Sequence, residues 1–280
     1  MFERKVKTLE KILNHLDGDF FKSINEDKEL YYACRSDYIS IYYKGIVWAK
    51  VGPESINLGT EIGNRIQCFD CRNLSLNDKL IYFLKNSKLI KNEIDKTNFT
   101  KKQIERKNET KLASEYGFSK GMVVIDIEAT IPKDEKIISR KTGDYKKAEI
   151  DMVVFDEKRK ILYLTEYKCK ESSMKNASGV IEHYSDMIQV LEKCRENFVK
   201  AEIDVYNMMT GKSIDYSDVE IKIALCFSDI DSAKVINVLD CDEIEKKDSI
   251  YIWVGEALEA VDFTIQPETV LNFVRDHTKR

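Results

Sequence analysis

The sequence predicts an α/β protein of two domains. Segments with apolar residues at helical spacing alternate with short runs of β-branched and aromatic residues. Hydrophobic residues make up 43% of the 280 residues, which is enough for a sizeable core. Hydrophobic density falls between residues 91 and 111, where seven basic and four acidic side chains give a local net charge of +3. We place the junction near residue 98, which separates an N-terminal domain (1–98) from a C-terminal domain (99–280).

The N-terminal domain is expected to be a small α/β unit with an antiparallel meander. A helix is predicted over residues 3–16, and Asp17-Gly18 ends it. Three strand-like runs follow, with turn residues between them, over 30–34, 38–43 and 46–51. A further strand is predicted over 65–70 and a helix over 77–94. These residues leave open whether the domain recognises nucleic acid, senses a ligand or forms a dimer.

The C-terminal domain is expected to run helix, three strands, long helix. The predicted segments are a helix over 101–116, strands over 122–131, 148–155 and 160–169, and an amphipathic helix over 178–198. Short strands over 221–227 and 249–254 and a helix over 268–277 follow. On the strand over 122–131 we favour a solvent-facing role for Asp126 and Glu128, and the alternative is that one of them faces the candidate site.

Composition and missing motifs exclude several classes of protein. Lys and Arg number 45 against 49 Asp and Glu, and this net charge of −4 argues against nucleic-acid binding by bulk charge but leaves room for a local basic groove. The chain has no GxxxxGK[ST], GxGxxG or GxSxG sequence, which argues against an NTPase, a dinucleotide enzyme and a hydrolase with a nucleophile elbow. The seven cysteines show no disulfide pattern, and the pair Cys68 and Cys71 lacks the second pair of a zinc ribbon.

The start of the chain lacks the apolar stretch of a signal peptide, and no apolar run reaches the roughly 20 residues needed to cross a bilayer. We therefore expect a soluble, reduced, cytoplasmic protein with no membrane partner.

Three charged residues lie on the two predicted central strands. Residues 149–155 are apolar on both faces except at the start, as in a buried strand. In the next strand, Glu166 and Lys168 point to the same side, roughly 6–7 Å apart. Antiparallel pairing could bring Asp151 beside Glu166, and two adjacent carboxylates form a cradle for a hard cation such as Mg²⁺ or Mn²⁺.

Asp151, fourteen intervening residues and then Glu166-Tyr167-Lys168 resemble the PD-(D/E)xK nuclease superfamily. The resemblance includes the helix–strand–strand–strand–helix order and covers roughly residues 101–230. It implies a restriction-endonuclease-like domain, in which a mixed sheet is flanked by helices and a strand hairpin carries the metal-binding acids.

The resemblance also implies a role for each matched residue. Asp151 and Glu166 would ligate Mg²⁺ or Mn²⁺, with the backbone carbonyl of Tyr167 as a third oxygen. Lys168 would orient or help to deprotonate the attacking water and stabilise charge on the phosphate. Many members add an acid from the helix before the sheet.

Two acids on that helix are available. We favour Glu109, which shares a helix face with Leu112 and Tyr116, while Glu115 remains open.

The loop over residues 133–147 is a candidate nucleic-acid contact. Six basic and three acidic side chains give it a net charge of +3, and Gly143 makes it flexible. The contacts would come from Arg140, Lys141, Lys146 and Lys147. An ordinary solvated hairpin tip is the alternative. Related groups often carry a Gln on the helix after Glu-x-Lys; His183 lies in that stretch here, and it could contact phosphate.

The sequence thus predicts a Mg²⁺- or Mn²⁺-dependent nuclease that hydrolyses phosphodiester bonds with a metal-activated water. DNA is favoured over RNA by family analogy alone, and a homodimer stays open. Two alternatives remain: a non-catalytic nucleic-acid-binding module with the same fold, and an interaction protein whose acidic cluster is only a salt bridge.

Overall fold

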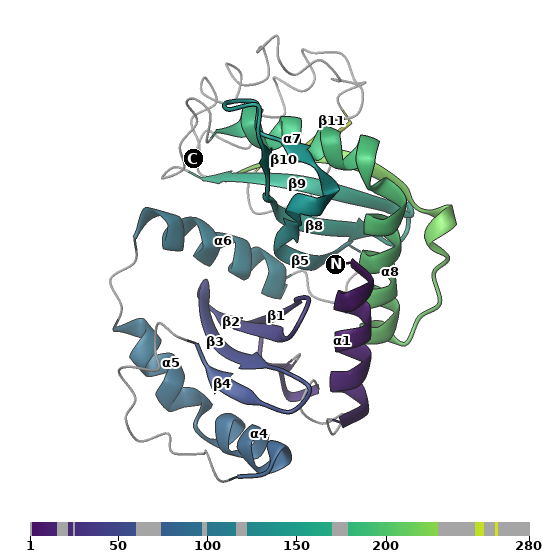
Figure 1. Cartoon of the computed structure of the whole chain (residues 1–280). Helices are drawn as coiled ribbons and strands as arrows, with labels where there is room; N and C mark the ends of the chain where they lie inside the picture. Colours follow the sequence, from purple (N-terminus) through teal and green to yellow (C-terminus); the bar gives the residue numbers. More distant parts are fainter. Residues whose placement is uncertain are drawn as a thin grey trace. The chain divides into compact units, whose positions relative to one another are not determined.

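The computed structural model divides the chain into two compact units (Figure 1). Unit 1 comprises Met1–Phe118 with Ala201–Ser213, and unit 2 comprises Ser119–Lys200 with Ile214–Arg280. The units therefore divide after Phe118 rather than near residue 98. The structure describes residues 2–15, 22–24, 26–59, 74–96, 100–115, 122–169, 179–228, 250–254 and 261–262.

Unit 1 contains a four-stranded antiparallel sheet in the order β1-β2-β3-β4. Its strands are β1 (Leu30–Cys34), β2 (Ile39–Tyr43), β3 (Ile46–Val51) and β4 (Ile56–Leu58). The predicted meander is confirmed. Lys44 and Gly45 join β2 to β3 with φ values of 50° and 76°, the left-handed backbone that tight hairpins require.

Unit 1 includes the helices α1 (Phe2–His15), α4 (Leu76–Lys85), α5 (Ser87–Asp95) and α6 (Lys101–Glu115). The helix predicted over 77–94 is interrupted at Asn86, where φ is −100° and ψ is 8°. The Asn86 side chain donates to the Tyr82 carbonyl at 2.8 Å, a local bond that competes with a continuous helix. Helix α6 packs on β1, β2 and β3, so it belongs to this unit.

Unit 2 contains a six-stranded mixed sheet in the order β12-β11-β10-β9-β8-β5. The strands are β5 (Met122–Ile131), β8 (Ala148–Asp156), β9 (Ile161–Cys169), β10 (Glu220–Ser228), β11 (Ile250–Val254) and β12 (Val261–Asp262). Strands β5, β8 and β9 are antiparallel, whereas β9, β10 and β11 are parallel. Every residue of β9 is buried, as expected of a central strand. The α/β class is confirmed.

Asp126 on β5 is a correction to the sequence expectation. Its side chain is buried rather than solvent-facing. The pairing of β5 with β8 shifts register between Val124 and Asp126, and such a bulge breaks the in–out alternation on which the expectation rested.

Two helices follow β9, namely α7 (Val180–Lys193) and α8 (Arg195–Thr210). The single helix predicted over 178–198 is interrupted at Cys194, where φ is −138°, and helical structure then continues to Thr210. Helix α7 packs against β8, β9 and β10. The predicted strand over 65–70, the predicted helix over 268–277 and the pair Cys68 and Cys71 lie outside the described residues.

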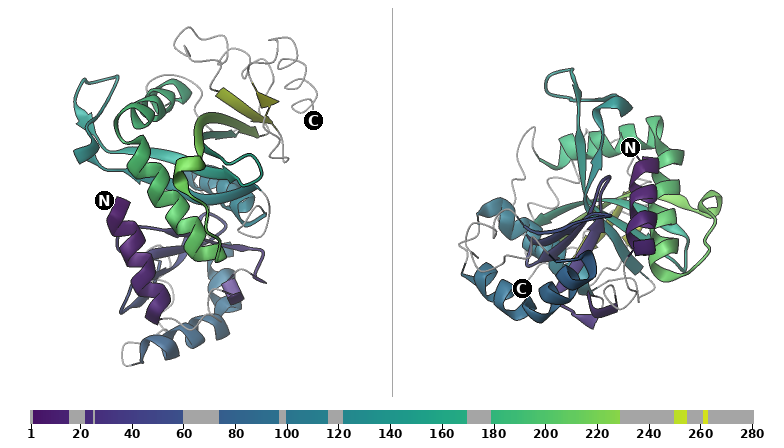
Figure 2. Two further views of the ribbon diagram at one scale, coloured as in Figure 1. Left: turned by 90° about the vertical axis from the view of Figure 1, so that its right-hand side faces the viewer. Right: turned by 60° about the horizontal axis from the view of Figure 1, so that its bottom comes forward.

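A small hairpin of β6 (Ile137–Ile138) and β7 (Tyr145–Lys146) precedes β8 and lies beside α7 (Figure 2). The side-chain amide of Gln189 on α7 accepts from the Ile138 N–H at 2.8 Å and donates to the Ile138 carbonyl at 2.9 Å. The Gln189 side chain thus bonds to the backbone of Ile138 in the way that a neighbouring strand would, and it joins α7 to the hairpin. Among the helices of the described residues, none combines the length and the apolar character that a membrane span requires.

Candidate metal centre

The pairing of β8 with β9 sets the position of the two acids. Met152 pairs with Thr165 in the antiparallel register, and Asp151 and Glu166 come directly before and after this pair. The two carboxylates therefore extend from neighbouring strands at the same level of the sheet, as predicted. The apolar residues around them form the core of unit 2 and hold both strands in place.

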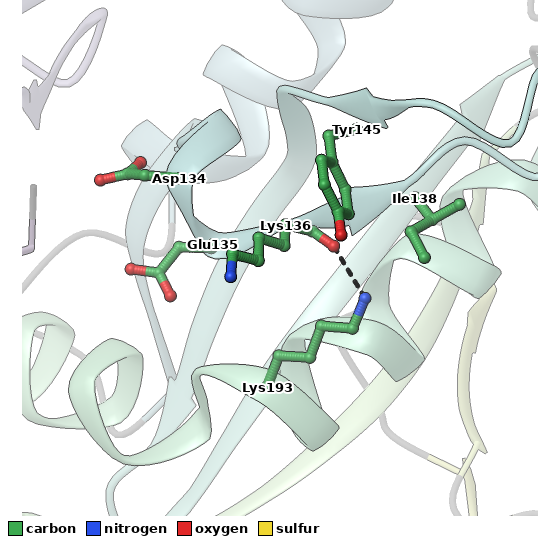
Figure 3. Close-up of a pocket in the computed structure, with 6 residues that line it drawn as sticks. All are labelled: Asp134, Glu135, Lys136, Ile138, Tyr145 and Lys193. Carbon is green, nitrogen blue, oxygen red and sulfur yellow. Dashed lines mark hydrogen bonds between the residues drawn. The ribbon is translucent and has the colours of Figure 1, made fainter.

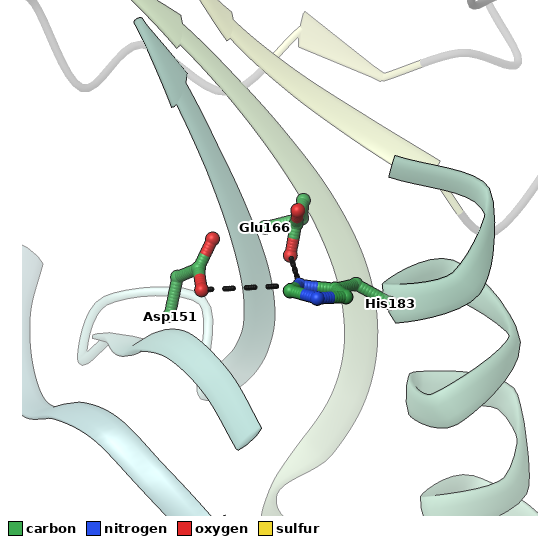
Figure 4. Close-up of side chains that lie close together, drawn as sticks. All are labelled: Asp151, Glu166 and His183. Atoms are coloured by element: carbon green, nitrogen blue, oxygen red, sulfur yellow. Dashed lines mark hydrogen bonds and ion pairs between the residues drawn. The ribbon is translucent and has the colours of Figure 1, made fainter. Parts of the chain in front are cut away.

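His183 of α7 completes a cluster with these acids (Figure 4). One ligand atom from each of Asp151, Glu166 and His183 lies within 4.8 Å of the others. His183 Nδ1 is 2.6 Å from Glu166 Oε2 and 4.0 Å from Asp151 Oδ1. Strands and helix thus bring three candidate ligands to one point.

Lys168 supplies a second positive group on the strand side of the cluster. Its Nζ lies 2.5 Å from Glu166 Oε1 and 3.6 Å from Asp151 Oδ2, and it donates to the Tyr167 carbonyl at 3.0 Å. The Tyr167 N–H donates to Asp151 Oδ2 at 2.8 Å, which fixes the orientation of that carboxylate. The Tyr167 carbonyl, expected as a third metal ligand, faces the ammonium here, and its role in metal binding stays a prediction.

The four side chains of the cluster differ in their exposure to solvent. The side chains of Glu166 and Lys168 are 1% and 5% exposed, whereas Asp151 is 13% and His183 is 28% exposed. A ligand would therefore approach past Asp151 and His183, with Glu166 and Lys168 at the back.

Burial and the neighbouring charges shift the pKa values of the acids in opposite directions. Burial and the charge of Glu166 raise the pKa of Asp151 well above its usual value. Burial alone would also raise the pKa of Glu166, but Lys168 and His183 outweigh it and lower this pKa to about 2. Buried surroundings oppose the charge of His183, yet the two carboxylates raise its pKa to about 9. Lys168 and His183 therefore offset much of the negative charge of the two carboxylates within the cluster.

His183 lies on the predicted helix and contacts Glu166, a contact that the sequence did not predict, and its contact with phosphate stays a prediction. A signal for this position exists in the helical spacing. Val180 and Met187 are buried, and His183 lies three residues after the first and four before the second, so it shares their face.

Glu109 and Glu115 lie on α6 in unit 1. Glu109 is buried, as its spacing to Leu112 predicts, while Glu115 is exposed and lies 3.9 Å from Lys111. Glu109 belongs to unit 1 and the candidate metal centre to unit 2, and the part expected of Glu109 at the metal stays a prediction.

The candidate nucleic-acid contacts divide into two groups. Arg140, Lys141 and Lys147 are exposed on and beside the β6–β7 hairpin. Lys146 is different, because its Nζ pairs with Glu182 at 2.6 Å and with Asp186 at 2.9 Å on α7. This lysine attaches the hairpin to the helix that carries His183, which is a structural role the local sequence did not suggest.

Comparison of the chain with family models, with curated proteins and with solved structures gives no match. The resemblance to the PD-(D/E)xK superfamily therefore rests on the residues and their placement.

Proposed function

We propose that this chain is a metal-dependent nuclease that hydrolyses phosphodiester bonds, with DNA as the favoured substrate. The observation that carries the proposal is the convergence of Asp151, Glu166 and Lys168 from two central strands in one cluster. A cluster of this kind combines ligands for a cation with a fixed ammonium that can meet a phosphate.

The donor set fits a divalent cation. Carboxylate oxygens suit Mg²⁺ and Mn²⁺, and imidazole is a more usual ligand of the later divalent metals than of Mg²⁺. Ligation by His183 together with both carboxylates would therefore favour Mn²⁺ over Mg²⁺. The raised pKa of Asp151 supports the fit, because burial beside Glu166 leaves its negative charge short of compensation.

When bound, such a cation lowers the pKa of a water molecule and offsets charge on the phosphate. The protein groups then have separate tasks. Asp151 and Glu166 would hold the cation, and the Tyr167 N–H keeps the Asp151 carboxylate in one orientation. Lys168, held at the back of the cluster, would orient the attacking water or bind a non-bridging phosphate oxygen. His183, at the open side, would accept or donate a proton at its free ring nitrogen.

A second candidate function rests on a specific observation. Lys168 and His183 each contact a carboxylate, so two formal positive charges balance two negative ones without a metal. This balance favours an interaction protein whose cluster serves folding alone, or a binding module without catalysis.

Cleavage assays with the full chain separate these functions. Plasmid DNA, single-stranded DNA and RNA are incubated with Mg²⁺, Mn²⁺ or chelator. Asp151→Asn and Lys168→Met are compared with Asp218→Asn and Lys160→Met, which alter an exposed ion pair of 2.8 Å in the same unit.

We expect metal-dependent cleavage in wild type and in both controls, with rates lower by about a hundredfold or more in the two cluster variants. Equal cleavage in the cluster variants would overturn the site. Binding without cleavage selects the binding module, and the absence of both selects the interaction protein.

A further inference from the structure

A surface hollow of about 450 Å³ lies beside the β6–β7 hairpin, and no residue of the candidate metal centre is among those that line it (Figure 3). Residues from the hairpin, from the short turn before it and from the end of α7 line it: Asp134, Glu135, Lys136, Ile138, Tyr145 and Lys193. Lys193 Nζ donates to the Lys136 carbonyl at 2.8 Å, which joins the helix to the wall of the hollow.

The apolar part of the lining is unusually exposed. Tyr145 is 51% and Ile138 is 39% exposed, and both rank among the exposed large hydrophobic side chains of the described residues. They lie on adjacent strands of one hairpin, where Ile138 pairs with Tyr145. An exposed aromatic ring beside an aliphatic side chain is a surface on which a flat heterocycle stacks.

The polar part of the lining favours a base over a bare phosphate. Two carboxylates, of Asp134 and Glu135, and two ammonium groups, of Lys136 and Lys193, give no net formal charge. A lone phosphate would meet the carboxylates, whereas the exocyclic amino groups of a base can donate to them. The exposed cations nearby, Arg140, Lys141 and Lys147, can then meet the phosphates on either side of that base.

The hollow stands at a fixed separation from the candidate metal centre. Lys193 follows His183 by ten residues on α7, which corresponds to about 15 Å along the helix axis. Lys146 and Gln189 bind the hairpin to the same helix, so the separation is set by one rigid element.

We propose that this hollow takes one unpaired base of a single-stranded segment, stacked on Tyr145, about 15 Å along α7 from the level of the phosphate at the metal centre. The position relative to that phosphate rests on the proposed function; the binding of the base does not. Bases in an intact duplex are stacked and paired, so they cannot enter the hollow.

Fluorescence anisotropy with a labelled single-stranded oligonucleotide tests this inference. The full chain with Asp151→Asn is used, so that cleavage does not interfere. Adding Tyr145→Ala should weaken single-strand binding by about 5- to 150-fold, while Tyr145→Phe keeps the ring and the affinity. Ile81→Ala, which removes an apolar side chain of similar exposure (49%) from α4, should change nothing.

Binding of duplex, competition by a mononucleotide and thermal unfolding complete the test. Affinity for the matching duplex should change less than twofold in Tyr145→Ala, and an equal loss on single strand and duplex would overturn the base pocket. Competition by a free nucleoside monophosphate as strong as that by the oligonucleotide would assign the hollow to a small nucleotide and overturn the strand. Unchanged thermal unfolding of Tyr145→Ala shows that the variant is folded.

The two proposals fail separately. If no substrate is cleaved but binding depends on Tyr145, the nuclease is wrong and the base pocket stands. If cleavage depends on Asp151 but Tyr145→Ala binds single strands like its parent, the pocket is wrong and the nuclease stands.

Discussion

Replacing Lys5 by Met should destabilise unit 1 strongly. Lys5 Nζ on α1 lies 2.6 Å and 2.8 Å from the two carboxylate oxygens of Glu202, and the two side chains are 9% and 2% exposed. Removing the ammonium takes away two short charged hydrogen bonds from a buried carboxylate. Loss of one member of such a pair costs about 3–5 kcal/mol of the free energy of unfolding.

The same helix supplies the control. Lys7 pairs with Glu3 at 2.7 Å, but these side chains are 64% and 81% exposed. Lys7→Met should therefore cost about 0–0.5 kcal/mol, since solvent already screens the pair. The double variant Lys5→Met with Glu202→Met should recover most of the loss, because apolar residues replace a buried pair at little cost.

Urea unfolding followed by circular dichroism measures these free energies. The reasoning is refuted if Lys5→Met and Lys7→Met differ by less than about 1 kcal/mol, or if the double variant is as unstable as Lys5→Met.

Three further predictions concern the backbone, the hairpin and pH. Gly45→Ala should lower the free energy of unfolding by several kcal/mol, because φ is +76° and a Cβ would lie 2.4 Å from the Lys107 backbone nitrogen. Gly143→Ala, with φ +75° and no atom within 4 Å of the added Cβ, should lower it by only about 1–2 kcal/mol. Urea unfolding measures both variants, and equal losses would contradict the prediction. Lys146→Met should speed amide hydrogen exchange in the β6–β7 hairpin, because it removes the ion pairs with Glu182 and Asp186 of α7. Exchange at the wild-type rate would show that these ion pairs do not hold the hairpin. In metal-free protein, the stability gained from protonated His183 is complete below pH 6.5 and is lost as pH rises through about 9. His183→Gln should abolish this decline of about 3 kcal/mol, and a decline that persists would assign it to another group.

The sequence patterns predicted the paired strands and their charged residues well. Most residues on both faces of β8 and β9 are apolar, and only a short turn separates the two strands. Their antiparallel pairing, which brings Asp151 beside Glu166, therefore follows from local information. The same holds for the meander of unit 1, where turn residues separate short β-rich runs.

Other features depend on contacts that no local pattern reveals. The breaks at Asn86 and Cys194 fall inside continuous helical spacing, because a single residue can leave the helix while the apolar face continues. The bulge that buries Asp126 is set by pairing with β8. Lys146 has the same charge as its neighbours in the loop, and only its long-range pairing with α7 distinguishes it.

The central claim is that a divalent cation binds between Asp151 and Glu166. Titration of the full chain with Mn²⁺, followed by electron paramagnetic resonance of the free ion, tests it without reference to cleavage. We expect one tightly bound ion per chain in wild type and in Asp218→Asn, and binding weaker by at least about tenfold in Asp151→Asn. Equal Mn²⁺ binding by wild type and Asp151→Asn, or none by wild type, would contradict the account.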